Sequence, residues 1–222
     1  MHAVFRIHEK WRHGLLLYWM FERLTSILAK IGIQLHPSVI YREFTSQAPA
    51  PEIGLPDCTW EFAAAAEMQE LAQVPAYGIS LDELYERLGE RAECFVLRHR
   101  GSIIAFTWCQ LDGPPRPRFG LTFGPKDAYL FNAHTDPAFR GRNVLPFLRH
   151  QLYLELTRRG RTNLISSTDI FNGPAHRFKR KLGAVPVEAR LYVKFGNRIE
   201  KVFTLRRFPT ARGPEVAPEL AS

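Results

Sequence analysis

Apolar residues recur at helical spacing close to the N-terminus. The residues that set this spacing are Leu16, Met20, Leu24, Ile27, Leu28 and Ile31, and Gly32 follows them as a helix end. The pattern predicts an amphipathic helix over residues 15–31, within a helical extension that covers residues 1–45. We expect it to pack on the rest of the chain or on a second copy. The alternative is a helix lying in a membrane interface. Its basic side chains would then face lipid phosphates: Lys10, Arg12, Arg23 and Lys30.

Beyond this helix the pattern alternates between strands and further helices. A Pro-rich linker, residues 46–57, precedes helical character over Trp60–Leu71, and a capping box at Ser80-Leu-Asp-Glu83 opens a helix that ends at Leu88. The later elements are strands at 93–98, 102–111 and 128–136, a helix at 144–159, a strand at 163–168, a helix at 174–182, and a hairpin of strands at 187–195 and 199–205. Antiparallel strands with a strand–helix–strand unit between them predict an α/β fold with a mixed, mostly antiparallel sheet flanked by helices. The domain is expected over residues 58–206, with a disordered tail at 207–222.

Composition narrows the class of protein. The 222 residues are 45% hydrophobic and 12% aromatic, which excludes a mainly disordered chain. The three cysteines, Cys58, Cys94 and Cys109, form no CxxC pair, so neither a metal site nor a disulfide framework is predicted. No apolar run approaches the ~20 residues of a membrane-spanning helix, and no secretory signal is apparent. We therefore expect a cytoplasmic protein, with peripheral contact at the inner membrane face as the alternative.

The positive charge is concentrated in one part of the chain. The formal net charge is +8, and between Ala138 and Lys181 ten Lys or Arg residues face only Glu155 and Asp169, so this window carries the whole excess. Such a field attracts polyanions, namely nucleic acid, acidic lipid, an acyl carrier protein or a nucleotide cofactor. A solvated basic face is the simpler interpretation of the same charges.

The chemistry is suggested by the segment between the strand at 128–136 and the helix at 144–159. A tight turn, Phe139-Arg-Gly-Arg-Asn143, follows Asp136-Pro137 and opens the helix. Backbone N–H groups at a helix start are unpaired, and the helix dipole adds positive potential there. Arg140 and Arg142 supply two further charges. The segment is therefore either a pyrophosphate cradle or an ordinary turn with solvent-facing arginines.

Two motifs in this region resemble those of the GNAT acetyltransferase superfamily. Pro137-Ala-Phe-Arg-Gly-Arg-Asn-Val resembles the coenzyme motif Pro-x-Tyr/Phe-Arg-Gly-x-Gly-Ile-Gly. Asn172-Gly-Pro-Ala-His-Arg-Phe-Lys-Arg-Lys-Leu-Gly183 resembles a second motif, Asn-x-x-Ala/Ser with a Lys-Leu-Gly ending. The resemblance covers about Trp60–Leu205. It implies a GNAT-like fold and direct transfer of an acetyl or other acyl group from acyl-CoA to an amine within a ternary complex.

The resemblance also implies a set of coenzyme-binding residues. The backbone of Gly141–Leu145 would hold the pyrophosphate, and the strands at 128–136 and 163–168 would splay apart to admit the pantetheine arm. The residues assigned to the acyl-CoA site are Thr135, Arg140, Gly141, Arg142, Asn143, Val144, Leu145, Asn172, Ala175 and Lys179. No metal is expected.

This sequence departs from the motifs at three positions. Asn143 and Leu145 replace two glycines; Asn143 tolerates positive φ better than most residues, so the turn is expected to survive. In many members a tyrosine after the second motif protonates the leaving thiolate, and Lys179 stands at that position here, beside Phe178.

Acyl transfer to an ammonium group needs a base. Asp127 is a candidate because some members place a carboxylate at the start of the strand before the coenzyme turn. His134 is the second candidate because its ordinary pKa suits the task. An exposed loop aspartate and a structural histidine are the alternative interpretations. Asp169 and Tyr192 are weaker candidates, and Cys109 is not expected to act as a nucleophile, because direct transfer needs no covalent intermediate.

The acceptor cannot be identified from these motifs. Residues 73–80 and 112–126 and the final hairpin would form the acceptor loops, and their aromatic and basic character favours an acidic or sugar-nucleotide acceptor. The partner expected is a small-molecule amine or amino sugar. Alternative functions are a long-chain acyltransferase that uses acyl carrier protein as donor, and a non-catalytic acyl-CoA-binding module. A homodimer is left open. Nucleic-acid binding is disfavoured, because the basic residues fall mostly on the coenzyme motifs and no helix-turn-helix or RNA-stacking motif stands out.

Overall fold

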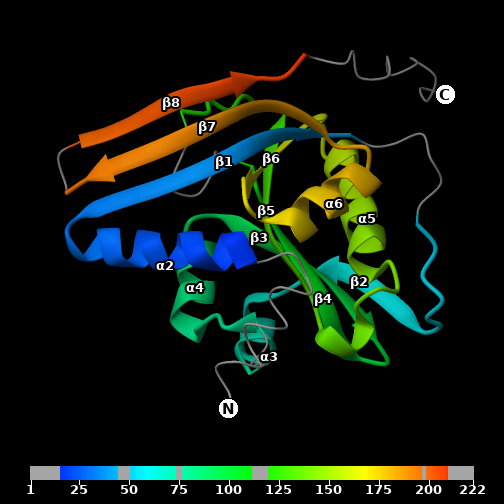
Figure 1. Cartoon of the computed structure of the whole chain (residues 1–222). Helices are drawn as coiled ribbons and strands as arrows, with labels where there is room; N and C mark the ends of the chain where they lie inside the picture. Colours follow the sequence, from blue (N-terminus) through cyan, green and yellow to red (C-terminus); the bar gives the residue numbers. More distant parts are fainter. Residues whose placement is uncertain (1–15, 45–50, 74–76, 112–119, 197–198, 210–222) are drawn as a thin grey trace.

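The computed structural model describes residues 16–44, 51–73, 77–111, 120–196 and 199–209, and its centre is an eight-stranded sheet (Figure 1). The strands are β1 (Ile33–Glu43), β2 (Cys58–Phe62), β3 (Ala92–His99), β4 (Ser102–Gln110), β5 (Asp127–Thr135), β6 (Asn163–Asp169), β7 (Val185–Phe195) and β8 (Ile199–Arg207). The helices are α2 (Leu16–Lys30), η1 (Ala65–Glu67), α3 (Met68–Ala72), α4 (Leu81–Gly89), η3 (Pro137–Phe139), α5 (Val144–Arg158) and α6 (Gly173–Lys181). The predicted α/β class with a mixed, mostly antiparallel sheet is confirmed.

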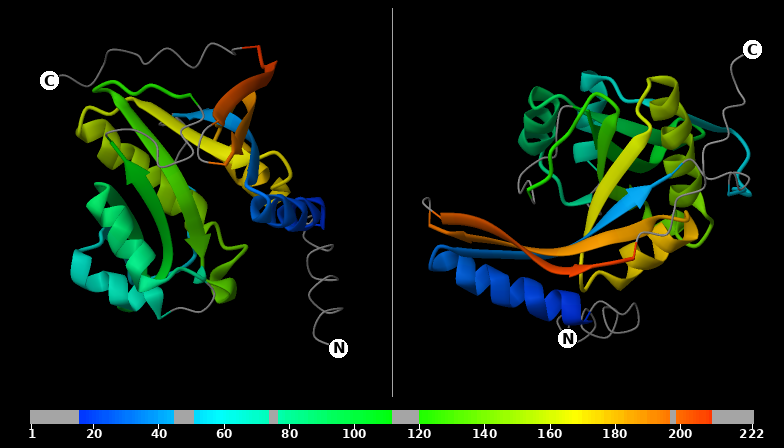
Figure 2. Two further views of the ribbon diagram at one scale, coloured as in Figure 1. Left: turned by 90° about the vertical axis from the view of Figure 1, so that its left-hand side faces the viewer. Right: turned by 90° about the horizontal axis from the view of Figure 1, so that it is seen from above.

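The order of strands across the sheet is β2-β3-β4-β5-β6-β1-β7-β8. Among the described strands β5 and β6 form the parallel pair, and the other neighbours are antiparallel. Figure 2 shows the sheet bending away between the β2–β5 part and the part that contains β1, β7 and β8. The crossover between the parallel strands is α5, as expected for a strand–helix–strand unit.

Helices cover both faces of the β2–β5 half. Leu148, Leu152 and Leu156 recur every four residues along α5 and form one core with side chains of β3, β4 and β5. On the opposite face α3 and α4 pack over Phe106 and Trp108. Strand β4 is thus buried on both faces, which explains why its sequence is a nearly continuous apolar run. Ser80 is the N-cap of α4, since its side chain accepts a hydrogen bond from the Glu83 N–H (3.2 Å), which is one of the two bonds of the predicted capping box.

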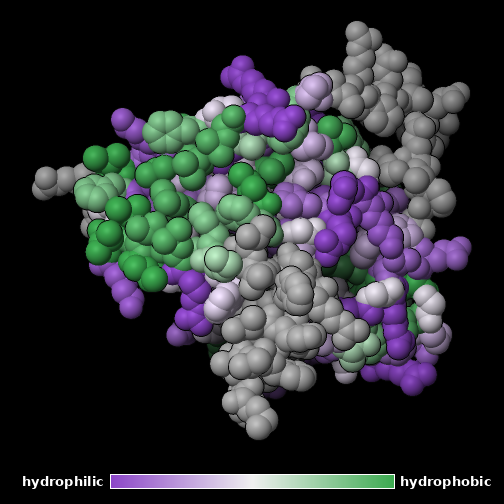
Figure 3. Space-filling view, in the orientation of Figure 1, coloured by the Kyte–Doolittle hydropathy of each residue, from purple (hydrophilic) through white to green (hydrophobic). Residues whose placement is uncertain are grey.

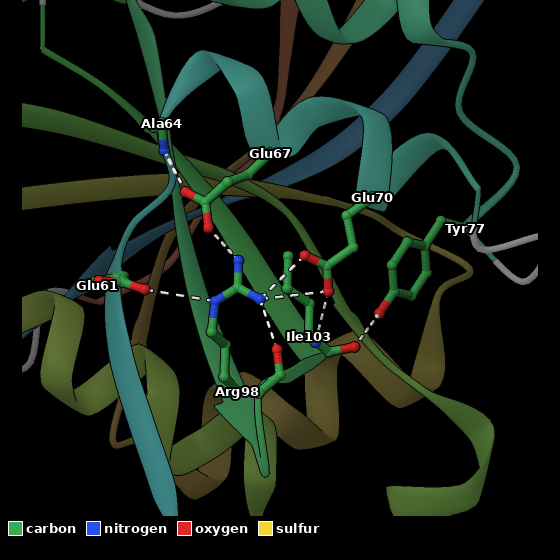
Figure 4. Close-up of polar contacts among 8 residues, drawn as sticks. Glu61, Ala64, Glu67, Glu70, Tyr77, Arg98 and Ile103 are labelled. Carbon is green, nitrogen blue, oxygen red and sulfur yellow. Dashed lines mark hydrogen bonds and ion pairs between the residues drawn. The ribbon is translucent and has the colours of Figure 1, made fainter.

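A group of charged side chains fastens η1 and α3 to the sheet (Figure 4). The Arg98 guanidinium on β3 pairs with Glu67, with Glu70 (3.0 Å) and with Glu61 (3.4 Å). Its Nη1 also donates to the carbonyl of Gly101 (2.8 Å). These four ionic residues, Arg98, Glu61, Glu67 and Glu70, are called the Arg98 cluster below.

The N-terminal part differs from the prediction in one major respect. The helix lies where it was expected, but residues 33–43, which were assigned to a helical extension outside the domain, form β1 between β6 and β7. The domain boundary at residue 58 is therefore wrong. The pattern Ile33, Leu35, Val39, Tyr41 has strand periodicity, but Pro37 interrupts it and proline is rare in central strands because it cannot donate to a neighbour.

A second difference concerns the predicted helix at Trp60–Leu71. Trp60 belongs to β2, which pairs with β3, and helical structure begins only at Ala65. The run of alanines suggested a longer helix, whereas the alternation in Cys58–Phe62 suits an edge strand. Of the predicted linker, residues 51–57 are described and contain no helix or strand, while residues 45–50 lie outside the described part. In the predicted tail, β8 extends to Arg207, and residues 210–222 also lie outside it.

One side of the molecule carries an unusual amount of exposed apolar surface, which we call the apolar face. It consists of Met20, Leu24, Ile27 and Ile31 in and just after α2, with Phe195, Ile199, Phe203 and Leu205 on β7 and β8. Figure 3 shows apolar side chains gathered over α2 and the β7–β8 hairpin. Within the described ranges no helix is long and apolar enough to cross a membrane.

Candidate active site

The turn before α5 has the backbone geometry that the first motif predicts. Gly141 and Asn143 both lie in the left-handed region, with φ of 79° and 60°. Asn143 therefore takes over the conformation for which glycine is usual, as expected, and its carbonyl accepts the first helical hydrogen bond from Phe147 (3.0 Å). Upstream, the Asp136 side chain caps η3 by accepting from the Ala138 N–H (2.8 Å).

This turn borders a cavity of about 230 Å³, called the turn cavity. Its lining residues are Thr135, Phe139, Arg140, Gly141, Asn143, Val144, Leu145, Pro146, Phe178 and Lys181. Lys181 donates to the Asn143 side chain (2.5 Å), which brings a cation from α6 to the start of α5. Together with Arg140 and the open N–H groups of the first helical turn, it makes the turn cavity a suitable place for an anion.

Strands β5 and β6 separate beside this turn. Their pairing ends at Leu130 and Ser166, although the strands continue to Thr135 and Asp169. A cavity of about 480 Å³, called the strand cavity, lies where they part. It is lined from β5 by Leu130, Phe131, Asn132 and Ala133, from β6 by Ser167, Thr168 and Asp169, and from the helices by Leu145, Arg149, Asn172, Pro174, Ala175, Phe178 and Lys179. Leu145 and Phe178 line both cavities, so the two are adjacent.

A cluster of buried polar side chains lies at the strand cavity. Glu43 at the end of β1 accepts hydrogen bonds from Tyr153 and Ser166, and pairs with Arg149 (Nε to Oε2, 3.5 Å) and Lys179 (Nζ to Oε1, 3.7 Å). The three ionic side chains are between 0 and 4% exposed. These five residues are called the Glu43 cluster, and two of them, Arg149 and Lys179, also line the cavity.

The electrostatics of the Glu43 cluster favour an ionised carboxylate and a weakened ammonium. Burial alone would raise the pKa of Glu43, but Arg149, Lys179 and the hydrogen bonds from Ser166 and Tyr153 bring it below its ordinary value. Burial lowers the pKa of Lys179 to about 7, against the attraction of Glu43 and with the help of Arg149. The single carboxylate of Glu43 is shared by two cations, so its attraction does not offset the effect of burial on Lys179. In addition, Arg149 Nε and Nη1 are buried without a hydrogen-bond acceptor.

Most residues assigned to the coenzyme from the sequence lie together. Thr135, Arg140, Gly141, Asn143, Val144 and Leu145 line the turn cavity, and Asn172, Ala175, Lys179 and again Leu145 line the strand cavity. Asn172 caps α6 by accepting from the Ala175 N–H (3.2 Å). Arg142 lines neither cavity; its guanidinium lies over the Phe139 ring, 5.9 Å from the centroid.

The two candidate bases do not lie with them. The Asp127 carboxylate accepts from the Gly124 N–H (2.6 Å) and the Asn163 side chain (2.5 Å), which fixes the turn before β5 where that strand is still paired with β6. His134 packs between the rings of Tyr77 and Phe106, at 4.5 and 5.8 Å between centroids, toward the α3–α4 side. Burial lowers its pKa, and Arg140 adds to the effect. Neither residue lines the strand cavity, so the geometry does not support either as the base.

The weaker candidates are also separated by the structure. Asp169 lines the strand cavity, and burial raises its pKa. Tyr192 packs with Ile40 in a small core elsewhere in the sheet. Cys109 is wholly buried in the core under α5, and burial raises the pKa of its thiol to about 12, so it is not suited to nucleophilic attack.

The partners of Lys179 were not predicted from the sequence. Glu43 was placed in the extension, because nothing local connects β1 to β6. Arg149 could have been noticed, since it is a charged residue that follows Leu148 on the buried side of α5. Within the described residues no group of three or more His, Cys, Asp or Glu side chains is arranged to hold a metal ion.

Comparison with known proteins defines the fold. No family model matches the sequence, and no curated protein matches it. A solved GNAT-family protein from Novosphingobium aromaticivorans superimposes with a TM-score of 0.53 at 15% identity, over 76% of this chain and 69% of that chain. A GNAT-family acetyltransferase from Colwellia psychrerythraea gives 0.54 at 18% identity, over 78% of this chain and 61% of that chain, so less than two thirds of the Colwellia protein is covered. The chain has the GNAT fold.

Proposed function

We propose that the chain transfers a short acyl group from acyl-CoA to an amine acceptor. The observation that carries the proposal is the pair of adjacent cavities. The turn cavity offers N–H groups and cations for a pyrophosphate, and the strand cavity begins where β5 and β6 part, which suits an extended arm that can pair with free strand edges. Acyl-CoA is a co-substrate here, with its diphosphate at Gly141–Leu145 and its thioester toward Lys179.

The charges at the strand cavity favour this proposal over a long-chain donor. A long alkyl chain would have to lie against Arg149 and Lys179, which is costly without a polar partner. A small acyl group such as acetyl avoids this. The inert state of Cys109 supports direct attack by the acceptor nitrogen on the thioester, without an acyl-enzyme. A small amine or amino sugar remains the proposed acceptor, and the proposed acceptor loops fall partly outside the described residues.

The test of the coenzyme site is a charge reversal at the turn. Arg140→Glu with Arg142→Glu should weaken CoA binding by about 1.5–3 kcal/mol, the contribution of one charge-assisted hydrogen bond, because Arg140 lines the turn cavity and Arg142 acts there only through its charge. Calorimetry with CoA measures the change. Arg206→Glu with Arg207→Glu makes the same change in net charge on β8, far from the turn, and should cost much less. Equal losses in the two double variants would remove the support for this site, and CoA binding without turnover would favour the non-catalytic alternative.

We further propose that the apolar face docks on an anionic lipid surface. The elements that carry the apolar face, α2 and β8, also carry an excess of exposed basic residues, called its basic margin: Arg23, Lys30, Lys201, Arg206 and Arg207, against Glu22 and Glu200. Apolar side chains within a basic margin suit a membrane interface. A second copy of the chain would instead bring two positive margins together, so charge complementarity favours lipid over a homodimer.

Vesicle co-sedimentation tests the lipid proposal. The full chain should bind vesicles of equal parts phosphatidylcholine and phosphatidylglycerol more strongly than pure phosphatidylcholine, and Ile27→Asp with Phe203→Asp should abolish binding. Tyr85→Asp, at an exposed aromatic on α4, serves as a control that adds one negative charge outside the apolar face. The proposal is contradicted if the full chain binds neither kind of vesicle. It is also contradicted if the full chain is a dimer that the double substitution dissociates.

A further inference from the structure

The ammonium group of Lys179 is held in a defined position at the strand cavity. Its Nζ donates to Ser166 Oγ (2.5 Å) and to the carbonyl of Ser167 (3.1 Å), and it lies 4.7 Å from the centre of the Tyr41 ring. The nearest carboxylate oxygen, on Glu43, is 3.7 Å away, which is beyond hydrogen-bond length. Two of the three ammonium protons therefore have acceptors, and the third has no close acceptor among the described residues.

The surroundings of Lys179 make its proton easy to release. Glu43 is shared with Arg149, whose charge is permanent, so the ammonium is left without a carboxylate of its own. The carboxylate reaches Lys179 only through Ser166, which donates to Glu43 and accepts from Lys179. A thiol such as that of cysteine has an ordinary pKa of ~8.5. The ammonium of Lys179, with a pKa of about 7, is the stronger acid of the two, so proton transfer to a thiolate is downhill.

We propose that Lys179 donates the proton that the coenzyme sulfur takes up when the thioester breaks, with Glu43 and Arg149 as positioning residues. This inference rests on the proposed acyl transfer. The acceptor nitrogen attacks the carbonyl carbon, the C–N bond forms, and the C–S bond breaks with its electron pair on sulfur. One proton moves from Lys179 Nζ to sulfur, leaving CoA as a thiol and the lysine as a neutral amine. The acceptor nitrogen loses one proton to water, and Lys179 regains one from water.

Other ionisable groups around the cluster do not titrate where Lys179 does. They are Tyr41 of β1, Tyr129 of β5, Tyr153 of α5, His176 of α6 and Asp169 of β6, whose pKa burial raises from a much lower ordinary value, besides Glu43 and Arg149. Burial raises the pKa of each of the three tyrosines above the ordinary value near ~10 and lowers the pKa of His176 below ~6.5. A change in activity near pH 7 on the basic side of the profile is therefore assigned to Lys179.

The experiment follows release of CoA from acetyl-CoA, with hydroxylamine as a small uncharged nucleophile in place of the acceptor. The wild-type rate should fall on the basic side of the pH profile with an apparent pKa of about 7. Lys179→Tyr should keep activity and move this fall toward the ordinary tyrosine value of ~10. Lys179→Met should remove it and lower kcat by about 10²–10⁴-fold. Arg100→Met, which removes one positive charge on the exposed β3–β4 turn, should leave the profile unchanged.

Calorimetry with CoA separates the possible failures. Both Lys179 variants should bind CoA as the wild type does, because the pyrophosphate cradle is untouched. A Lys179→Met protein with wild-type rate and pH profile overturns the inference and leaves the proposed function standing. A wild-type chain that binds no CoA overturns both. If Lys179→Met does not fold, the wild-type and Lys179→Tyr profiles decide, and the same basic limb in both overturns the inference.

Discussion

The Arg98 cluster and the Glu43 cluster each surround one charged side chain with partners of opposite charge, but they differ in exposure and in the sign of the excess. In the first, a cation meets three carboxylates, two of which are more than one third exposed. In the second, a carboxylate meets two cations, and all three side chains are buried. Water can compensate the extra charge in the first cluster, whereas the second has to compensate it internally.

The pKa values of Arg98 and Lys179 reflect this difference in burial and charge. Burial lowers the pKa of the Arg98 guanidinium, but hydrogen bonds and charges from Glu70 and Glu67 raise it above its ordinary value overall. At Lys179 the burial effect dominates and the pKa falls. The Arg98 cluster holds α3 on the sheet and lines neither of the two cavities described above, while Arg149 and Lys179 line the strand cavity. An uncompensated buried charge beside a cavity is therefore the better indicator of a functional site.

The largest expected effect in this comparison comes from removing the single buried carboxylate. Glu43→Gln leaves Arg149 and Lys179 without an anion and should lower the free energy of unfolding by about 3–5 kcal/mol, measured by urea denaturation at pH 7. Adding Arg149→Met should recover part of the loss, because it removes the permanent charge and leaves only Lys179, which can release its proton. If Glu43→Gln costs less than 1 kcal/mol, the cluster is reached by water and the comparison fails.

How much of this site follows from the sequence depends on how local its parts are. The turn at Gly141–Asn143 and the cap at Asn172 are set by neighbouring residues, so both could be predicted with the helices that follow them. The parting of β5 and β6 was implied by the family resemblance and agrees with the strand pairing.

The Glu43 cluster could not be predicted in the same way. Glu43 meets Tyr153 and Ser166 across separations of 110 and 123 residues, and only the insertion of β1 between β6 and β7 brings them together. Pro37 interrupts the apolar alternation of β1, so that strand was not predicted from the sequence. The candidate bases lie away from the strand cavity for a related reason. A bulge in β5, where Asn132 has a φ of 42° and the register with β4 shifts, turns His134 to the α3–α4 side, and motif spacing does not predict such a bulge.

The smallest expected effects concern the Arg98 cluster, and they test the other half of the comparison. Glu70→Gln should lower the free energy of unfolding by at most about 1 kcal/mol, because Arg98 keeps Glu67 and the exposed carboxylate is well hydrated. The new amide oxygen can still accept from the Ile103 N–H, which lies 3.1 Å from Glu70 Oε1. Glu61→Gln, at the more exposed and more distant partner, should change stability by less than about 0.5 kcal/mol. Urea denaturation of these two variants and of Glu43→Gln, under the same conditions, gives the free energies of unfolding to be compared. A loss at Glu70 as large as that at Glu43 would mean that exposure does not separate the two clusters, and that the charge excess at Lys179 needs another explanation.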